Sequence, residues 1–372
     1  MLTAALLITA GLAALFQGGD ALVLGAGRLA RRFGVSPLVI GLTVVAFATS
    51  APELAVSLIA AWEGTPALAV GNVLGSNIFN VLIAVGAVAL ITPIAVQPTL
   101  YRREIPFCLA VTLLALFFSW TGGGLGRLEG ALLTLLLAGF LSMVVYQSLG
   151  AARVLADMDD EDDDEDVERD TGAAALVVIG AVGATAVGWD SEGAIRLLLA
   201  LAAVATFGLA VFAEQRRGNL INLTAIGLGL LLLVLGSDAL VDGCTTIAQA
   251  FGVSEAVIGL TVVAIGTSAP ELATALVAAR RGQDDIAVGN ALGSNLFNLL
   301  AVLGLTALIK PIPVDPRFLG LDGWIAVGAV IILVPSAYLG ARISRTMGAA
   351  FVGLWVIYTG WLIIQETARI QG

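Results

Sequence analysis

Long apolar runs separated by short polar turns are the dominant pattern of this 372-residue chain. The runs are about 20 residues long, which is enough for a helix to cross the ~30 Å hydrocarbon core of a bilayer. Because every backbone polar group must be satisfied inside lipid, such runs predict helices. We therefore predict an all-α polytopic membrane protein. Its roughly twelve transmembrane segments are expected near 2–26, from 37 to the turn at 62, 66–91, 105–120, 128–149, 173–189, 194–213, 220–243, 256–279, 286–309, 319–339 and 347–364.

An internal repeat links the two halves of the chain. Residues 41–53 read Gly-Leu-Thr-Val-Val-Ala-Phe-Ala-Thr-Ser-Ala-Pro-Glu, and residues 259–271 repeat this segment with two changes. A second motif, Gly-Ser-Asn-Ile-Phe-Asn ending at Asn80, returns with one change and ends at Asn298. Of the 47 positions from 34 to 80, 32 are identical to the residue 218 positions later. A repeat this strong sets the fold before any local feature does.

The repeat divides the chain into four predicted parts. Residues 1–150 form a first five-helix repeat, 151–172 an acidic cytoplasmic linker, 173–214 two extra segments, and 215–372 the second repeat. Seven predicted spans separate equivalent points, so the second repeat enters the membrane from the opposite side. Inverted repeats are typical of secondary transporters, whose site lies at the midplane where the repeats meet.

The distribution of basic residues supports this inversion. With the N-terminus outside, the inside loops hold thirteen arginines against five basic residues outside, which follows the positive-inside rule of a cell-membrane protein. The turn Trp62-Glu63 in the first repeat becomes Arg280-Arg281 in the second. Near-identical helices therefore carry opposite topological signals at equivalent turns.

Composition excludes several classes of protein. The chain is 59% hydrophobic and 12% charged, with a mean hydropathy of +0.99, which is too apolar for a soluble domain. It has no basic stripe, which argues against a nucleic-acid partner. Histidine is absent and the two cysteines stand in no ligand spacing, so we predict no imidazole or zinc site and no cofactor.

The net charge of −10 comes largely from one tract, because eleven of the 28 acidic residues lie within 157–170. A like-charge run of this density stays solvated, which favours a cytoplasmic linker. Two alternatives are a low-affinity Ca²⁺ sensor and an adaptation to a high-salt cytoplasm. The tract lacks EF-hand spacing, so no defined Ca²⁺ loop is predicted.

Two acidic residues stand out because of their predicted depth. Glu53 and Glu271 lie about ten residues into a span, so about 15 Å from its end. A carboxylate near the bilayer centre costs roughly 2.5–3.5 kcal/mol on insertion scales. A bound cation would offset that cost. The alternative is pairing with a basic residue, but the repeat helices carry no lysine or arginine at comparable depth.

A proline precedes each of these glutamates. Pro52 and Pro270 donate no backbone hydrogen bond, which frees the carbonyls of Ala48 and Gly266. Hydroxyl groups fill the preceding turn, at Thr49, Ser50, Thr267 and Ser268. Such hydroxyls often bond the helix backbone alone, which is the structural alternative. Together with the carboxylates they make an all-oxygen environment, which hard cations such as Ca²⁺ and Na⁺ prefer.

Asparagines complete the predicted site. Asn80 and Asn298 follow their glutamates by 27 residues, so the chain leaves the midplane, turns and returns to a similar depth. Ser76 and Ser294 lie one turn earlier on the same helix face. Asp20 and Asp238 are also paired by the repeat, and they line an access path or bond neighbouring helices.

These motifs resemble the α-repeats of the sodium/calcium exchanger family, in the wider calcium/cation antiporter superfamily and of the prokaryotic type. The resemblance is most specific over 34–93 and 252–311. It implies electrogenic exchange of Na⁺ for Ca²⁺ by alternating access between two inverted five-helix halves. The chain departs from the family pattern at Asn298, where archaeal relatives commonly carry aspartate, and in the extra segments at 173–213.

The resemblance also implies ligands. Ca²⁺ would be bound by Glu53 and Glu271 with oxygens of Thr49 and Thr267, and Asn80 and Asn298 would border the middle. The Na⁺ sites would draw on Ala46, Thr49, Ser50, Glu53 and Ser76, and on Ala264, Thr267, Ser268, Glu271 and Ser294.

We therefore expect a Na⁺/Ca²⁺ antiporter that exports Ca²⁺ down the Na⁺ gradient, and not an enzyme. Its expected partners are the two ions and membrane lipid, with a monomer as the working assumption. One alternative is a Ca²⁺/H⁺ antiporter on the same scaffold. A more remote one is a cation channel, which would need no inverted duplication.

Overall fold

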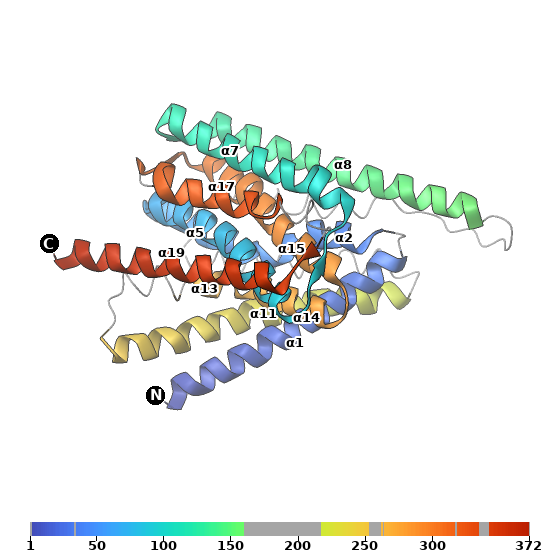
Figure 1. Cartoon of the computed structure of the whole chain (residues 1–372), viewed down its shortest axis with the longest axis horizontal. Coiled ribbons are helices and arrows are strands. Elements are labelled where there is room, and N and C mark those ends of the chain that lie inside the picture. The colour runs from blue at the N-terminus through green and yellow to red at the C-terminus, as the bar shows by residue number, and fades with distance from the viewer. Residues whose placement is uncertain are drawn as a thin grey trace.

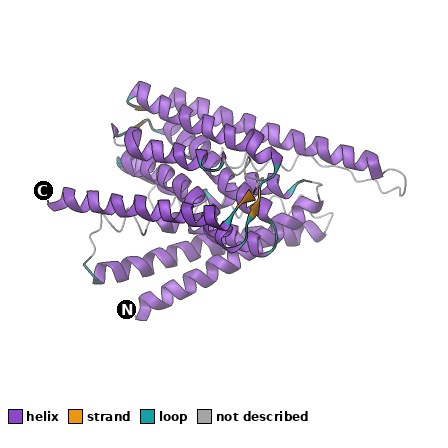
Figure 2. Cartoon of the chain, in the orientation of Figure 1, coloured by secondary structure: helices purple, strands orange, loops and turns teal. Residues whose placement is uncertain are grey.

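The computed structural model describes residues 2–32, 35–159, 217–252, 262, 264–316, 318–334 and 342–371. The acidic tract beyond Asp159 and the predicted extra segments at 173–189 and 194–213 lie outside the described residues, as do parts of the predicted segments at 256–279 and 319–339. The described chain is almost entirely helical (Figure 2).

Seven described helices are long and apolar enough to cross a membrane, and a bent helix pair makes up to eight. This confirms the all-α polytopic class, whereas the predicted total of about twelve exceeds what the described residues contain. The predicted segment at 319–339 is represented by a shorter apolar helix, Phe318–Ile331. The seven are Leu2–Ala30, Pro66–Ile91, Leu100–Gly122, Arg127–Val144, Asn222–Ala250, Asp284–Ile309 and Arg345–Gln365.

Helices α1 (Leu2–Arg32) and α11 (Arg217–Ala250) pack along their length, at the bottom of Figure 1. They run antiparallel, and glycines at seven-residue spacing face the partner backbone. A Cβ atom added to Gly18 would lie 2.7 Å from the carbonyl oxygen of Gly229, and one added to Gly11 would lie 2.7 Å from that of Gly236. Small residues at these positions therefore permit the close approach of the two helices.

Helix α1 of this pair also contacts α14 (Ala269–Arg280) and the turn that follows it. Helix α1 packs on α14, and the side chain of Arg281 donates to Asp20 with its Nε 2.8 Å from Oδ1. This ion pair gives Asp20 a structural partner. In the first repeat the position equivalent to Arg281 is Glu63.

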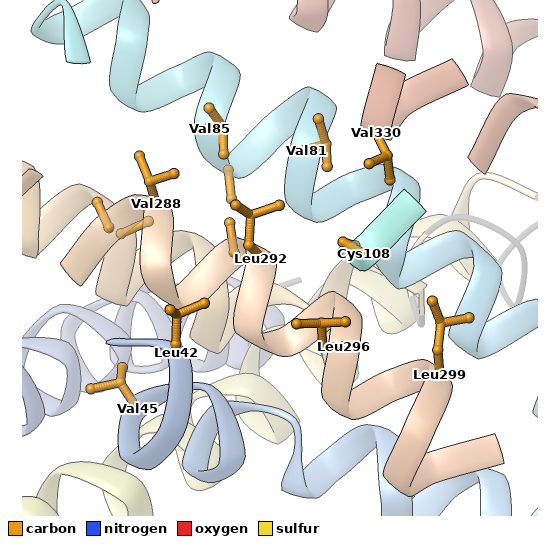
Figure 3. Close-up of a cluster of buried hydrophobic side chains, with 14 of the residues drawn as sticks. Leu42, Val45, Val81, Val85, Cys108, Val288, Leu292, Leu296, Leu299 and Val330 are labelled. Atoms are coloured by element: carbon orange, nitrogen blue, oxygen red, sulfur yellow. The ribbon is translucent and has the colours of Figure 1, made fainter. Parts of the chain in front are cut away.

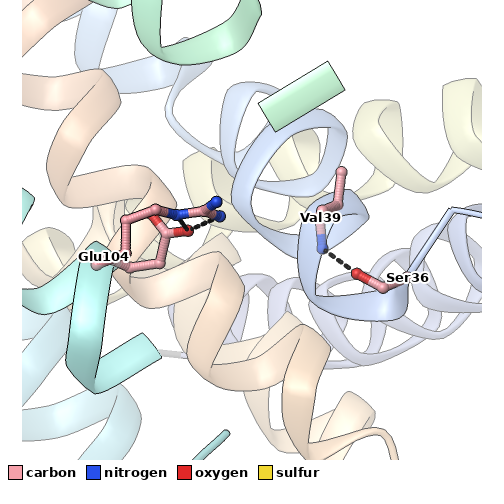
Figure 4. Close-up of polar contacts among 4 residues, drawn as sticks. Ser36, Val39 and Glu104 are labelled. Atoms are coloured by element: carbon pink, nitrogen blue, oxygen red, sulfur yellow. Dashed lines mark hydrogen bonds and ion pairs between the residues drawn. The ribbon is translucent and has the colours of Figure 1, made fainter. Parts of the chain in front are cut away.

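The bent pair contains the first repeated motif. Ser36 caps the start of α2 (Pro37–Ile40) by accepting the N–H of Val39 at 3.3 Å (Figure 4). A π-helical turn, η1 (Gly41–Val45), and α3 (Ala46–Thr49) follow, and α4 (Ala51–Glu63) leaves at an angle of 43°. The break lies at Ser50, because Pro52 in the first turn of α4 cannot continue the preceding helix.

The second repeat has the same break. Helix α13 (Ala264–Thr267) is followed by a break at Ser268, whose φ of −94° and ψ of 4° are close to the −83° and 3° of Ser50. Helix α14 then begins with Pro270 in its first turn. Each break sets a glutamate at the start of a new helix segment.

The central layer consists of two long composite helices. One contains α5 (Pro66–Phe79), η2 (Asn80–Val85) and α6 (Gly86–Ile91). The other contains α15 (Asp284–Phe297), η6 (Asn298–Leu303) and α16 (Gly304–Ile309). In both, an α-helix changes to a π-helix at the asparagine that ends the second motif. π-Turns of this kind are rare and often occur at functional sites.

Four further helical segments surround this layer. The span predicted at 105–120 begins earlier, at the π-helical residue Leu100. The span predicted at 128–149 continues to Asp159, into the predicted linker. In the π-helical segment Leu100–Glu104, the buried Glu104 pairs with the neighbouring Arg103 (Figure 4). The segments are η3 (Leu100–Glu104) with α7 (Ile105–Gly122), α8 (Arg127–Asp159), η7 (Phe318–Asp322) with α17 (Gly323–Ile331), and α19 (Arg345–Gln371).

Two short antiparallel ribbons join the repeats, and the sequence did not predict them. Strand β1 (Ile94–Ala95) pairs with β4 (Arg342–Ile343), and β2 (Gly124–Leu125) pairs with β3 (Ile312–Pro313). β3 is β1 shifted by 218 residues, and β4 is β2 shifted by the same amount. Each ribbon therefore contains one strand from each repeat.

Aliphatic side chains fill the space between the composite helices (Figure 3). Leu292 and Leu296 of α15 are fully buried beside Leu42 of η1. On the same face of α15, a Cβ atom at Gly293 would lie 2.6 Å from the Cβ of Ala46, so the two helices are in direct backbone contact. This close packing brings the first motif of one repeat against the second motif of the other.

Candidate functional site

The two glutamates lie fully buried in the first turns of α4 and α14, and serines from both repeats bond them. Ser268 and Ser76 each donate to Oε1 of Glu53 at 3.3 Å. Ser50 donates to Oε1 of Glu271 at 3.5 Å. Since Ser50 and Ser268 each reach the glutamate of the other repeat, the two breaks face one another.

The second carboxylate oxygen of each glutamate has no hydrogen-bond partner. Oε2 of Glu53 and Oε2 of Glu271 are buried without one. Within the described part of the chain, no arginine or lysine forms an ion pair with either group. A buried carboxylate that is neither paired nor fully bonded is costly, so these two oxygens call for a cationic partner.

Asn80 and Asn298 present a second pair of oxygens. Each lies at the first residue of a π-helix and is fully buried. Asn80 donates its Nδ2 to Oδ1 of Asn295 at 3.1 Å, and Asn298 donates its Nδ2 to Oδ1 of Asn77 at 3.0 Å. The Oδ1 atoms of Asn80 and Asn298 have no partner.

The threonines of the first motif connect the repeats. Thr49 Oγ1 donates to Oδ1 of Asn290 at 3.1 Å and lies 3.2 Å from Oγ of Ser294. Thr267 Oγ1 donates to Oδ1 of Asn72 at 3.4 Å. The hydroxyls of Thr49 and Ser294 also lie against Glu271. The predicted serines and Thr49 therefore lie around the two carboxylates, whereas the bond of Thr267 is to Asn72.

The backbone carbonyls near the two helix breaks also lie among side-chain hydroxyls. The carbonyl of Ala46 accepts the N–H of Ser50 at 3.0 Å, and the hydroxyl oxygen of Thr49 lies 3.3 Å from it. The carbonyl of Gly266, which Pro270 was expected to free, accepts the hydroxyl of Ser237 from α11 at 2.5 Å. Ala264 begins α13, and its side chain lies outside the described set.

Sequence reasoning assigned Asn72 and Asn290 to an access path or to bonds between helices, and it did not single out Asn77 and Asn295. Asn72, Asn77, Asn290 and Asn295 are all buried and bond across to the other repeat or to a glutamate backbone. Asn72, for example, donates Nδ2 to the carbonyl oxygen of Glu53 at 3.2 Å. Their positions within the repeated motifs were the available signal, but their partners depend on how the helices dock.

The fold and the site together define a class of protein. A bundle of membrane-length helices, in which two sequence repeats meet around a buried polar core rich in oxygen atoms, has the architecture of a secondary transporter. The sequence model of the sodium/calcium exchanger protein family matches residues 3–146 and 221–364, two segments separated by 218 positions. The chain belongs to the sodium/calcium exchanger family, which confirms the resemblance found in its motifs and makes it a transporter and not an enzyme.

Individual relatives extend over nearly the whole chain. The putative antiporter CaxA of Alkalimonas amylolytica is 38% identical over 360 residues, which cover 95% of this chain and 98% of that protein. The inner membrane protein YrbG of Escherichia coli is 34% identical over 364 residues, which cover 98% and 96%.

A solved structure shares the fold. The sodium-calcium exchanger NCX_Mj, from crystals soaked with 2.5 mM Na⁺ and 1 mM Sr²⁺, superposes with a TM-score of 0.73 at 26% identity. The match covers 97% of this chain and 98% of that one. The fold is therefore that of a multi-pass membrane transporter.

Proposed function

We propose that this protein exchanges Na⁺ for Ca²⁺ across the membrane by alternating access. The observation that carries the proposal is that four of the buried oxygens without a hydrogen-bond partner belong to the predicted site, one each from Glu53, Glu271, Asn80 and Asn298. Two carboxylates balance the charge of one Ca²⁺, and Ca²⁺ takes 6–8 oxygen ligands. The surrounding serine and threonine hydroxyls supply further oxygens.

Competition for the same two carboxylates would couple the ions. Glu53 and Glu271 cannot bind Ca²⁺ and a full set of Na⁺ ions at once, so occupancy by one ion excludes the other. Without a cation, the two buried negative charges oppose reorientation because they would face the low-dielectric interior of the bilayer. Only the loaded states then cross between the two access conformations, which is the requirement for exchange.

The proposed inverted topology is supported by the contacts at the two ends of the Pro66–Ile91 helix. At its first end, Lys310 donates to the carbonyl of Trp62, and Lys310 immediately precedes the β2–β3 ribbon. At its last end, Arg345 donates to the carbonyl of Ile91, beside the β1–β4 ribbon. Strands related by the repeat therefore lie at opposite ends of one membrane-length helix.

The charge at these ends gives the proposed orientation. The β1–β4 end gathers the arginines of η3, the turn after α14 and the start of α19, whereas the β2–β3 end has Arg127 and Lys310 nearby. By the positive-inside rule the β1–β4 end is cytoplasmic. Helix α1 brings Gly27 to Gln283 at that end, which supports the proposal that its first residue lies outside. Because one chain supplies every ligand, we propose a single chain as the transport unit.

The test is a flux measurement with purified protein in proteoliposomes. Na⁺-loaded vesicles should take up Ca²⁺, and Glu53→Gln or Glu271→Gln should reduce uptake at least ~100-fold, because removing one member of a buried charge set costs about 3–5 kcal/mol. Glu63→Gln is the matched control, since this carboxylate is exposed at the end of the same helix as Glu53. Undiminished uptake by either site variant would exclude the proposed site.

The same vesicles test the coupling ion. With a pH gradient and no Na⁺, the proposed exchanger should take up no Ca²⁺ above the background of empty vesicles. Uptake driven by the pH gradient alone would instead identify a Ca²⁺/H⁺ antiporter, in which the two buried carboxylates carry the protons. Ca²⁺ flux without any counter-ion would identify a channel.

A further inference from the structure

Asn77 and Asn295 form a hydrogen-bonded relay between the two central helices. Both are buried, one on α5 and the other on α15. Asn77 donates its Nδ2 to the backbone carbonyl of Asn295 at 3.3 Å, and Asn295 donates its Nδ2 to the carbonyl of Asn77 at 3.2 Å. The exchange is reciprocal, and each residue is the repeat equivalent of the other.

The relay fixes the orientation of two further side chains by elimination. A backbone carbonyl only accepts hydrogen bonds, so the atom of Asn77 that faces Asn295 must be its nitrogen. Its remaining atom, Oδ1, only accepts, and it lies 3.0 Å from the amide of Asn298. Asn298 must therefore turn its nitrogen toward Asn77. Its Oδ1, which has no partner, is the atom left for the site.

The same reasoning applies in the other direction. Oδ1 of Asn295 accepts the amide nitrogen of Asn80 at 3.1 Å, which leaves Oδ1 of Asn80 without a partner. A carboxamide that rotated by half a turn would present N–H groups in place of an oxygen. Such a group would repel a cation, which requires oxygen ligands.

We propose that Asn77 and Asn295 are positioning residues that hold the oxygens of Asn298 and Asn80 toward the transported cation. The inference rests on the proposed function and deepens it, because the relay would act through ion binding. Each ligand amide is oriented by the opposite repeat. Ion affinity at one repeat therefore depends on the docking of the other.

A double-mutant cycle separates positioning from general stability. Equilibrium binding of radioactive Ca²⁺ is measured on the purified full-length protein in detergent, without Na⁺. Asn77→Ala should weaken binding ~10-fold, or about 1.4 kcal/mol, because it removes a hydrogen bond to a ligand side chain. In the Asn298→Asp background the same substitution should weaken binding no more than about 2-fold, because a carboxylate presents an oxygen in either rotation.

The equivalent cycle uses Asn295→Ala with Asn80→Asp. If Asn77→Ala does not purify as a folded protein, Ca²⁺ binding by this second set of variants tests the proposal. An equal loss in the asparagine and aspartate backgrounds would assign these residues a purely structural role and overturn the proposal. If Asn77→Ala and Asn295→Ala failed to fold both alone and in the aspartate backgrounds, the proposal would also be overturned. If the unmodified protein bound no Ca²⁺, the proposed function itself would fall, which is distinguishable from failure of the relay alone.

Discussion

At the scale of single residues, the site is built from reciprocal bonds between repeats. Ser268 bonds the glutamate of the first repeat and Ser50 bonds that of the second. Each serine stands at a helix break, where its backbone departs from helical ψ. A hydroxyl beside a buried carboxylate lowers the cost of its charge, so the break and the charge stabilisation come from the same residue.

Removing these hydroxyls should weaken ion binding without abolishing it. Ser50→Ala or Ser268→Ala should raise the Na⁺ concentration for half-maximal Ca²⁺ exchange about 10-fold, since a hydrogen bond to a charged group is worth about 1.5–3 kcal/mol. The measurement is Na⁺-dependent Ca²⁺ flux in proteoliposomes. Ser142→Ala is the control, because this exposed hydroxyl bonds the backbone of its own helix. A Na⁺ dependence equal to that of the unmodified protein would contradict the assigned role.

At the scale of helices, proline and π-turns decide where ligands point. Pro52 and Pro270 interrupt two spans and turn Glu53 and Glu271 into first-turn residues of new segments. An acidic group in the first turn also faces the positive end of the helix dipole. The π-turns that begin at Asn80 and Asn298 re-aim these side chains relative to a regular α-helix.

Restoring a continuous helix should therefore disable the site. Pro52→Ala supplies an N–H to the carbonyl of Ala48 and removes the ring that prevents a regular turn. We expect exchange to fall at least ~10-fold while the protein stays folded, because a ligand displaced by about 1 Å costs ~10²-fold in comparable sites. Flux and thermal unfolding in detergent measure both effects.

Pro66→Ala is the matched control for this substitution. Pro66 stands in the first turn of α5, where proline interrupts no hydrogen bond. Exchange by Pro66→Ala should match that of the unmodified protein. If Pro52→Ala were equally active, the break would not be needed for ion binding.

At the scale of the whole molecule, the two repeats interlock at their centre and at both ends. The central asparagines bond across the interface, and each ribbon takes one strand from each repeat. Outside this interlocked layer, α1 and α11 form a separate pair whose backbones touch at glycines. The site lies within the interlocked layer, where side chains of the two repeats bond one another.

The orientation of the molecule is open to direct measurement. In a background without Cys108 and Cys244, single cysteines are introduced as Trp62→Cys and Arg342→Cys, two exposed positions at opposite ends. A membrane-impermeant maleimide added to intact cells should label Trp62→Cys. It should label Arg342→Cys only after the membrane is permeabilised. The reverse pattern would place the arginine-rich end outside, against the positive-inside rule.

Much of this organisation was predictable because it depends on local pattern. Apolar length predicted the membrane-length helices of the described residues. The duplicated motifs predicted that Glu53, Glu271, Asn80 and Asn298 share one site; all four are buried, and their convergence stays a prediction. The relays through Asn77 and Asn295, the ribbons and the bond from Ser237 to Gly266 were not predictable. They depend on which faces of two helices dock, and hydrophobic periodicity in one sequence does not specify that register.

The ion pair between Asp20 and Arg281 breaks the equality of the two halves. At the corresponding place in the other half, Asp238 would meet Glu63, and two acids do not attract. A chain with two identical inverted repeats would have two alternating-access conformations of equal free energy. Because the Arg281–Asp20 ion pair is present at one end only, it should favour one of these two conformations by up to about 1 kcal/mol.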